Sequence, residues 1–439
     1  MQQPVFEVNG SFSLPALIKS LEHCPCGREH TAQLKSVCIG EGLTAQTGDI
    51  LARNNFPKKI LAVADKNTLA AADGVLQSLE DAGFDYTLKL YDDLRTAEME
   101  QVNVIEELLT ACDGCVSIGT GSLNDICRLA CFRRDKAFAI FATAPSMDGF
   151  ASDSAPITDH GFKVSYPARQ PSVIIADTLV LAAAPAVLKS AGFGDMIGKL
   201  VALADWRISA LITGEHYCPA VAAVTREALT RIISLAPLVT QNNPHAAGEI
   251  MKALVLTGTA MQLEGSVRPA SGTEHIISHF WEIKKLEQGL LSDFHGRKVG
   301  VATLIVNRIY KEIVAQAQLG VHTERVDWDE VYAAYGKNFC DDVKRLNTPP
   351  VTDLTTPDII RDNWEQIRRI VNEELPSQSE LISIMQSAGA ALTVEDIAVS
   401  RELGDAGVKY HPFMRYRMTL MRLLPMLDVN ISLTCDTGA

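Results

Sequence analysis

The sequence lacks the features that would place a protein in a membrane or on a nucleic acid. No window of its 439 residues is apolar for long enough to cross a bilayer. The opening MQQPVFEVNG has neither the basic segment nor the apolar stretch of a secretory signal. Acidic residues outnumber basic ones, 53 to 40, for a formal net charge of -13. This charge argues against nucleic acid or an acidic membrane surface as the main partner. We therefore expect a cytoplasmic protein without membrane insertion.

Cysteine is also sparse, because ten residues in a chain of this length are too few for a disulfide scaffold. Cys112 and Cys115 form a CxxC where a helical pattern ends and an apolar strand begins, which favours buried core thiols. Cys24, Cys26 and His30, in CPCGREH, offer three possible zinc ligands, but a structural zinc site needs four. A tight turn between two N-terminal strands is the alternative for this segment.

The chain is long enough for two domains, and its two halves differ in pattern. In the first half, short apolar runs such as KILAVAD and AFAIFATA alternate with amphipathic stretches, which predicts parallel strands joined by crossover helices. KVSY and SVIIAD should complete this sheet, with Asp177 capping the next helix. From Gly192 onward helical periodicity prevails, including RYRMTLMRLLPML. We expect an α/β nucleotide-binding domain over 1–191, with a cysteine-containing extension at its start, and an all-helical metal- and substrate-binding domain over 192–439.

A glycine-containing loop follows the predicted strand GCVSIG. Gly119 and Gly121, in GTGSLND, would let a phosphate approach the backbone closely, and the next helix would present unpaired N–H groups to it. The loop is not a GxGxxG, and a tight turn would use the same glycines. We assign cofactor binding here to Gly119, Gly121, Ser122 and Asp125.

A second polar loop, PSMDGFASDSAP, directly follows the buried strand AFAIFATA, where it is well placed for binding. We expect four side chains here to face the ligand: Thr143, Ser146, Asp148 and Ser152. Ordinary turn chemistry would also explain the Asp148–Gly149 pair.

Asp65 ends the strand KILAVAD and could accept hydrogen bonds from a ribose diol of the cofactor. It could equally be the N-cap of the following helix. Lys66, beside it, could meet a 2'-phosphate, so the choice between NAD and NADP stays open.

The helical half concentrates three histidines within about two dozen residues. His275 and His279 lie four residues apart, which places both rings on one face of a helix. His295 precedes a second apolar run, so a short loop could fold its ring back against the first pair. The arrangement suits a metal ion, although an isolated HxxxH is more often an ordinary surface or core feature. Asp195 and Lys199 share one face of an earlier predicted helix.

The order of GTGSLND, TAPSMDG, GFGDMIGK, SGTEHIISH and FHGRKVG resembles the iron-containing alcohol dehydrogenase superfamily, which includes glycerol dehydrogenases and 3-dehydroquinate synthases. TAPSMDGFASDSAP, GFGDMIGKLVALADW and SGTEHIISHFWE look most like its sn-glycerol-1-phosphate dehydrogenases, the bacterial AraM-type group. The resemblance runs from about Lys35 onward and implies the dehydroquinate synthase-like fold. The family's GGGxxxD phosphate loop falls on Gly119 to Asp125, with Thr120 in place of the middle glycine. Arg128 stands where many members have lysine.

The resemblance also implies a role for each motif residue. It assigns one divalent metal, which could be zinc, nickel or iron, to Asp195, His275 and His295. His279 matches a histidine that stays near the substrate without ligating the metal. Asp148 and Ser152 match positions that approach the substrate hydroxyls and the nicotinamide. Catalysis would then fall to His279 and Asp148.

The implied reaction is a metal-dependent, NAD(P)H-linked reduction of dihydroxyacetone phosphate to sn-glycerol 1-phosphate, a step of phospholipid biosynthesis. A metal held by one carboxylate and two imidazoles would polarise the ketone oxygen, and a proton would arrive through His279 or water. An acidic protein needs a local cation to hold a phosphate dianion. Lys163 and Lys199 are the candidates, and each could instead be a solvated surface lysine.

Three alternative functions remain at this level. The chain could oxidise an uncharged polyol such as glycerol, act as a lyase-type sugar phosphate cyclase, or be a non-catalytic nucleotide- or metal-binding regulator. We expect a homo-oligomer, a dimer or larger, that acts on a small phosphorylated molecule.

Overall fold

The computed structural model describes residues 7–8, 11–159 and 162–439, so most of the MQQPVFEVNG segment lies outside the described residues. The chain divides into two compact units. The first comprises Met1–Met196 with Ala223–Ser266, and the second comprises Ile197–Ala222 with Val267–Ala439. A single boundary at residue 192 would assign Ala223–Ser266 to the second domain. The helix Pro244–Glu264 (α10) belongs instead to the first unit, where it packs against Thr178–Ala183 (α7) and the strand Ser36–Gly40.

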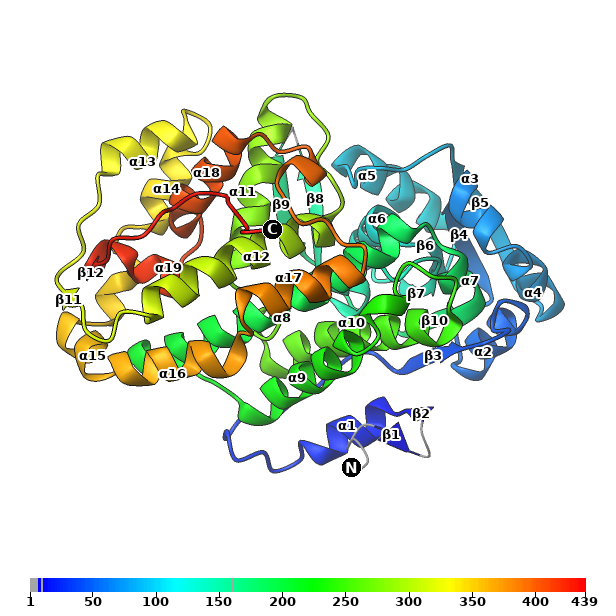
Figure 1. Cartoon of the computed structure of the whole chain (residues 1–439). Coiled ribbons are helices and arrows are strands. Elements are labelled where there is room, and N and C mark those ends of the chain that lie inside the picture. The colour runs from blue at the N-terminus through cyan, green and yellow to red at the C-terminus, as the bar shows by residue number, and fades with distance from the viewer. Residues whose placement is uncertain (1–6, 9–10, 160–161) are drawn as a thin grey trace. The chain divides into compact units, whose positions relative to one another are not determined.

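The first unit is built on a six-stranded sheet whose strands all run parallel, as the sequence predicts (Figure 1). Its order is β3-β10-β7-β6-β4-β5. The inner strands are buried along their length, so residues on both faces must be apolar, and this explains the continuous runs. The strands are β3 (Ser36–Gly40), β4 (Lys59–Asp65), β5 (Asp85–Tyr91), β6 (Gly114–Gly119), β7 (Ala137–Ala142) and β10 (Val173–Asp177).

Helices connect these strands, and two of them are shorter than their sequence patterns. The amphipathic stretch 67–83 contains parts of two helices, because the chain breaks at Gly74, whose φ of 97° is a left-handed conformation suited to glycine. Asp177 caps α7 as predicted, accepting a hydrogen bond from the Leu179 N–H at 3.0 Å, but Pro185 separates α7 from the next helix. The helices between strands are α2 (Thr47–Arg53), α3 (Lys66–Ala71), α4 (Val75–Asp81), α5 (Met99–Leu108) and α6 (Gly121–Arg133).

Two sequence expectations for this unit are wrong. KVSY does not join the parallel sheet: β9 (Phe162–Pro167) pairs antiparallel with β8 (Ser154–Asp159) in a separate hairpin. Val164 and Ser165 are exposed, so the run lacks the two-sided burial of a central parallel strand. CPCGREH does not lie between two strands either. It follows a helix, α1 (Leu14–Ser20), which comes after the short pair β1 (Glu7–Val8) and β2 (Ser11–Phe12).

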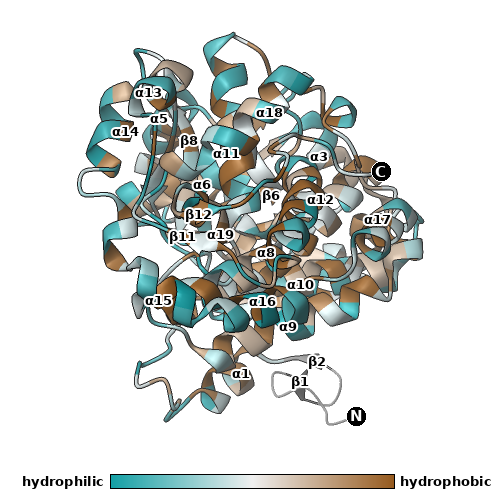
Figure 2. Ribbon diagram, turned by 60° about the vertical axis from the view of Figure 1, so that its left-hand side comes forward, coloured by the Kyte–Doolittle hydropathy of each residue, from teal (hydrophilic) through white to brown (hydrophobic). Residues whose placement is uncertain are grey.

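The second unit is helical, as expected, around a core that includes Trp281 and Tyr310. Its helices are amphipathic: on α16 (Trp364–Glu374) the buried residues recur every three or four positions, and the outer face is hydrophilic (Figure 2). Among the described residues no helix is both long and apolar enough to span a bilayer. The other helices that lie wholly or partly in it are α8 (Ala186–Thr213), α9 (Pro219–Ile233), α11 (Thr273–Glu287), α12 (His295–Val314), α13 (Trp328–Tyr335), α14 (Cys340–Leu346), α15 (Pro357–Asp362), α17 (Gln378–Ser387) and α18 (Arg401–Tyr410).

The segment RYRMTLMRLLPML departs from its helical pattern. Only Leu420–Leu423 (α19) is α-helical, and a 3-10 turn over Leu424–Met426 contains Pro425 near its start. The chain then extends into β12 (Leu427–Asp428), which pairs with β11 (Gly320–Val321). A proline cannot donate the hydrogen bond that would continue the helix, so the pattern ends there.

Candidate active site

The loop after β7 is fixed by two close backbone approaches within the first unit. A Cβ at Gly192, on α8, would lie 1.9 Å from the carbonyl oxygen of Pro145. A Cβ at Gly258, on α10, would lie 2.8 Å from the carbonyl oxygen of Asp148. Any side chain at either position would push the loop away, so the two glycines determine where Asp148 sits.

A buried arginine also holds this loop. Arg128, on α6, is fully buried and donates hydrogen bonds to the carbonyl oxygens of Phe150 (3.1 Å), Ser154 (3.0 Å) and Gly149. Gly149 and Phe150 belong to the turn Asp148–Ala151 (η3), and Ser154 follows shortly after it. Sequence reasoning treated Arg128 only as a departure from the lysine of relatives. The structure shows that it clamps the loop that carries Asp148 and Ser152.

The glycine loop has the geometry of a phosphate cradle. A Cβ at Gly119 would lie 2.4 Å from Cδ1 of Leu123, so a side chain at position 119 would force the Leu123 side chain to move. Gly121 opens α6 with a φ of 32° and open space on its Cβ side. The N-cap residue, Thr120, makes no side-chain capping bond; its hydroxyl meets that of Ser146 at 2.5 Å instead. The N-terminus of α6 is therefore not capped by its own N-cap side chain, as a site for a phosphate requires.

Two of the predicted cofactor residues, Asp65 and Ser122, form hydrogen bonds within the chain, and a third, Asp125, is a buried carboxyl group. Asp65 is nearly buried and forms a capping box with Thr68, accepting from its N–H at 2.8 Å, so the N-cap interpretation is confirmed. Ser122 donates to the Arg95 carbonyl at 3.0 Å. Burial raises the pKa of Asp125 to about 6, while the charges of Arg128 and Lys163 oppose this rise. Their roles toward a cofactor stay predictions.

The three histidines of the second unit lie together. The ring centroids of His275 and His295 are 5.2 Å apart, those of His279 and His295 are 5.7 Å apart, and those of His275 and His279 are 6.4 Å apart. His275 and His279 come from α11, as their spacing predicts. His295 is the first residue of α12 rather than part of a loop. His275 is buried, whereas the other two rings are partly exposed.

The orientation of the His275 ring is set by its neighbour in the sequence. The Nδ1–H of His275 donates to Oε1 of the fully buried Glu274 at 2.5 Å, because a carboxylate at this distance accepts the hydrogen bond. The same oxygen accepts from the Gly272 N–H at 2.9 Å. With Nδ1 protonated, the lone pair of a neutral ring is on Nε2, and this is how carboxylates orient metal-binding histidines. Sequence reasoning missed Glu274, although it directly precedes a predicted ligand.

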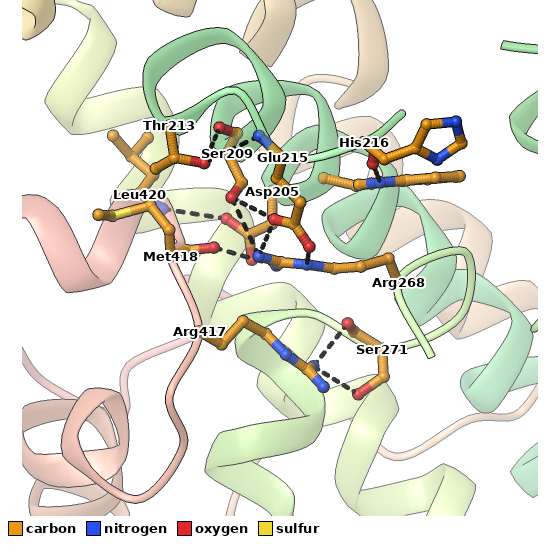
Figure 3. A network of polar contacts seen from close by, with 11 residues as sticks. Asp205, Ser209, Thr213, Glu215, His216, Arg268, Ser271, Arg417, Met418 and Leu420 are labelled. Carbon is orange, nitrogen blue, oxygen red and sulfur yellow. Dashed lines mark hydrogen bonds and ion pairs between the residues drawn. The ribbon is translucent and has the colours of Figure 1, made fainter. Parts of the chain in front are cut away.

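A network of buried polar groups fixes the start of α11, and Figure 3 shows the part of it around Asp205 and Leu420. Asp205, on α8, is fully buried and accepts from the N–H groups of Thr273 (2.8 Å) and Leu420 (3.1 Å) and from the Tyr310 hydroxyl (2.6 Å). Burial raises the pKa of Asp205, and the hydrogen bond from Tyr310 opposes this rise. Thr273 is the first residue of α11, so these bonds set the position of the helical turn that carries His275.

Two arginines lie below Asp205 in Figure 3. Arg268 donates to Glu215 at 2.7 Å and to the Ser209 hydroxyl at 3.0 Å. Arg417 donates to the backbone carbonyl of Ser271, two residues before α11, at 2.8 Å. Both contacts restrain the segment that leads into the histidine helix.

Asp195, His275 and His295 each present a ligand atom, and these atoms all lie within 4.8 Å of one another. Asp195 is fully buried, and its Oδ2 accepts from the Asp148 N–H at 2.9 Å. One carboxylate and two imidazoles are the donors of many divalent-metal sites that keep a coordination position for substrate. The donor set and the tautomer of His275 therefore fit a divalent cation, and His279 is not in the group. This ligand assignment stays a prediction.

The two candidate phosphate-binding lysines differ in burial. Lys199, on α8, is fully buried, so the solvated-surface alternative is wrong for this residue. Lys163, on β9, is partly buried, and its charge acts on Asp125. Their roles toward a substrate phosphate stay predictions.

Comparison with known families gives a consistent picture. The profile of the family described as iron-containing alcohol dehydrogenase matches residues 38–185. A glycerol-1-phosphate dehydrogenase [NAD(P)+] of Bacillus velezensis is 33% identical over 402 residues, which cover 89% of this chain and 91% of that protein. A glycerol-1-phosphate dehydrogenase [NAD(P)+] of Halalkalibacterium halodurans is 29% identical over 91% of this chain and 95% of its own.

Solved structures with the same fold are more distant in sequence. A probable glycerol dehydrogenase from Sinorhizobium meliloti superposes with a TM-score of 0.59 at 15% identity, covering 91% of this chain and 93% of its own. An iron-containing alcohol dehydrogenase from Thermotoga maritima gives a TM-score of 0.58 at 15% identity, covering 90% and 97%. These likenesses confirm the fold that the sequence motifs imply.

Proposed function

This chain belongs to the glycerol-1-phosphate dehydrogenase family, and on that premise we propose that it catalyses the NAD(P)H-linked, metal-dependent reduction of dihydroxyacetone phosphate to sn-glycerol 1-phosphate. We base the proposed metal dependence on one observation of this chain. A buried carboxylate, Asp195, shares a small volume with His275 and His295, whose donor atoms suit a divalent metal.

Asp195, His275 and His295 would hold the metal, and Glu274 would keep the His275 Nε2 directed at it. When bound, a divalent cation at such a site acts as a Lewis acid toward a ketone oxygen, which gains negative charge as hydride arrives at the carbon. The backbone N–H of Asp148 holds one oxygen of Asp195, so the loop after β7 and the carboxylate keep a fixed relation.

The cofactor and the substrate phosphate would use separate parts of the chain. The N-terminal turn of α6, with Gly119 and Gly121, would receive the pyrophosphate of NAD(P)H. Lys163 and Lys199 are the cations that we propose for the substrate phosphate. The partly exposed His279 ring, 5.7 Å from that of His295, would pass a proton to the product oxygen.

The substrate separates this proposal from its nearest alternative, the oxidation of an uncharged polyol. We propose to strip the protein with a chelator, restore zinc, nickel or iron in turn, and follow nicotinamide absorbance with dihydroxyacetone phosphate or dihydroxyacetone. A much higher kcat/KM for the phosphorylated ketone supports the proposal. Equal turnover of the two ketones supports a polyol dehydrogenase, and no turnover with any metal refutes both.

The same proposal includes a homo-oligomer in the cytoplasm. Sedimentation of the purified chain tests the first part, and fractionation of the source cells tests the second.

A further inference from the structure

A second group of metal-ligating side chains lies outside the proposed active site. Cys24, Cys26, His30 and Cys218 each present a ligand atom, and these four atoms all lie within 4.8 Å of one another. The sequence offers the first three in CPCGREH and leaves the set one ligand short. We propose that Cys218 supplies the fourth, and that these residues form a structural zinc site of the Cys3His type. This inference does not rest on the proposed function.

The donor types and the spacing fit zinc. Structural zinc is four-coordinate and tetrahedral, and Cys3His is one of its recurrent ligand sets. With a Zn–S distance of about 2.3 Å, two sulfurs on one tetrahedral ion lie about 3.8 Å apart. This separation is below the 4.8 Å within which the four ligand atoms lie. Cys26 Sγ and His30 Nε2 are 3.2 Å apart. Three thiolates also disfavour magnesium and calcium, which take oxygen ligands.

The His30 ring is held in the tautomer that a metal needs. Its Nδ1 lies 2.6 Å from the carbonyl oxygen of Leu263, and a carbonyl can only accept, so the proton is on Nδ1. In a neutral ring Nε2 then carries the lone pair, and it is Nε2 that faces Cys26. His30 is 5% exposed, so this orientation is fixed inside the fold. A backbone carbonyl is a common outer partner of zinc-binding histidines.

Two of the three sulfurs, those of Cys26 and Cys218, lie where backbone N–H groups stabilise a thiolate. The Arg28 N–H donates to Cys26 Sγ and the Val221 N–H donates to Cys218 Sγ, both at 3.5 Å. Cys218 is fully buried and immediately precedes α9, a helix of 15 residues, so the positive end of that helix favours a negative sulfur. Gly27 has a φ of 81°, a left-handed conformation suited to glycine, which allows the CPCG turn to close. The N–H of Gly27 donates a hydrogen bond to the carbonyl oxygen of Cys24 at 3.1 Å.

A metal would stabilise a part of the chain that has little other structure. Residues 21–35 contain turns and irregular backbone but no helix or strand. The segment leads to Gln33 and Leu34, whose N–H groups donate to the Gln170 side chain at 3.0 and 2.8 Å. Gln170 in turn donates to the Ala151 carbonyl, next to Ser152, at 2.5 Å. Fixing the cysteine segment therefore also supports the loop after β7 from outside the reacting groups.

Cobalt substitution of the full-length chain tests the proposal, because thiolate ligands give cobalt(II) a charge-transfer absorption that nitrogen and oxygen ligands do not. We expect wild type to bind two equivalents, with this absorption present. The variant His275→Ala should lose the metal equivalent of the proposed active site and keep the thiolate absorption. If it loses no metal, the active-site assignment fails, whereas the cysteine site is still tested by the absorption. Cys26→Ser and Cys218→Ser should each lose most of the absorption. The matched control Cys340→Ser, at a partly exposed cysteine outside the group, should keep it.

A measurement on unaltered protein covers the case in which a variant does not fold. Cys24 and Cys26 are partly exposed, so a thiol reagent should reach them. In the zinc-loaded protein we expect both to be protected until a strong chelator is added. Rapid reaction of both thiols while zinc remains bound would overturn the proposal, as would cobalt binding by wild type without thiolate absorption.

Discussion

The two ligand groups of this chain differ in donor chemistry and in how the fold supplies them. The active-site group has one carboxylate and two imidazoles, all carried on long helices, and three protein ligands leave room for a substrate. The cysteine group has three sulfurs and one imidazole, mostly on irregular backbone, and four protein ligands would close the coordination shell. The number and type of ligands, together with the backbone that carries them, therefore distinguish the proposed catalytic site from the proposed structural one.

Removing a ligand from the active-site group should have the largest effect. Because Lewis-acid stabilisation by a metal contributes several kcal/mol to the transition state, His275→Ala should lower kcat/KM for dihydroxyacetone phosphate by about a thousandfold. The variant should lose one metal equivalent and keep the zinc of the cysteine group, measured by elemental analysis. His245→Ala, at an exposed histidine of α10, is the control. Unchanged activity in folded His275→Ala would refute the ligand assignment.

Changing the residue behind that ligand should have a smaller effect confined to the same group. Glu274→Gln preserves the shape of the side chain but removes the negative acceptor for the His275 Nδ1–H. We expect metal affinity at this site to fall by about tenfold to a hundredfold, because outer carboxylates orient their histidines. Competition with a metal indicator measures the affinity. An unchanged affinity would mean that the ring needs no such support.

A third variant tests whether the buried carboxyl group of Asp125 lowers the stability of the first unit when it is ionised. The folded-state pKa of Asp125, about 6, lies above the unfolded value of 3.8, so the group stabilises the fold most at low pH. That contribution is complete below about pH 4 and is lost as the pH rises through 6. Asp125→Asn stays neutral. It should therefore exceed wild type in unfolding free energy by about 3 kcal/mol at pH 8, but by less than about 1 kcal/mol at pH 4.

Denaturant unfolding of the cofactor-free protein at both pH values measures this difference. A gain that is the same at pH 4 and pH 8 would show that the ionisation of Asp125 is not its cause.

The smallest effect should come from the ion pair beside the cysteine group. Arg28 Nη1 lies 3.4 Å from Glu264 Oε1, but the Arg28 side chain is half exposed. Such a pair contributes less than about 1 kcal/mol, so Arg28→Ala should lower the Tm by only about 2 °C. Zinc content should not change. Loss of zinc in this variant would mean that the ion pair, rather than the four ligands, keeps the segment folded.

The residues of the proposed active-site group were found from two different signals in the sequence. The i, i+4 spacing placed His275 and His279 on one helix face, and the order of motifs supplied Asp195 through a family resemblance. Sequence reasoning also recovered the parallel sheet, since strands buried on both faces leave uninterrupted apolar runs. The helical pattern of RYRMTLMRLLPML misled because Pro425 ends the helix. KVSY is a strand, as its pattern predicts, but it pairs in a separate hairpin and not in the parallel sheet.

The contacts that sequence reasoning missed depend on residues far apart in the chain. Cys218 lies nearly two hundred positions after Cys26, and no motif surrounds it. The sequence therefore showed only three of the four proposed zinc ligands, and a tight turn explained these equally well. Arg128 donates hydrogen bonds to backbone carbonyl groups, and Asp205 accepts them from backbone N–H groups. No pattern of residues in the sequence indicates such contacts. Glu274 is the exception, because a carboxylate next to a predicted histidine ligand is visible in the sequence.

The central claim, that one metal is catalytic and a second is structural, is tested most directly by native mass spectrometry of the full chain during chelator titration. Activity toward dihydroxyacetone phosphate is assayed on the same samples. We predict that activity disappears as the mass falls from the two-metal to the one-metal form, and that the fold persists until the second metal leaves. Full activity in the one-metal form, or a chain that never carries more than one metal, would contradict the claim.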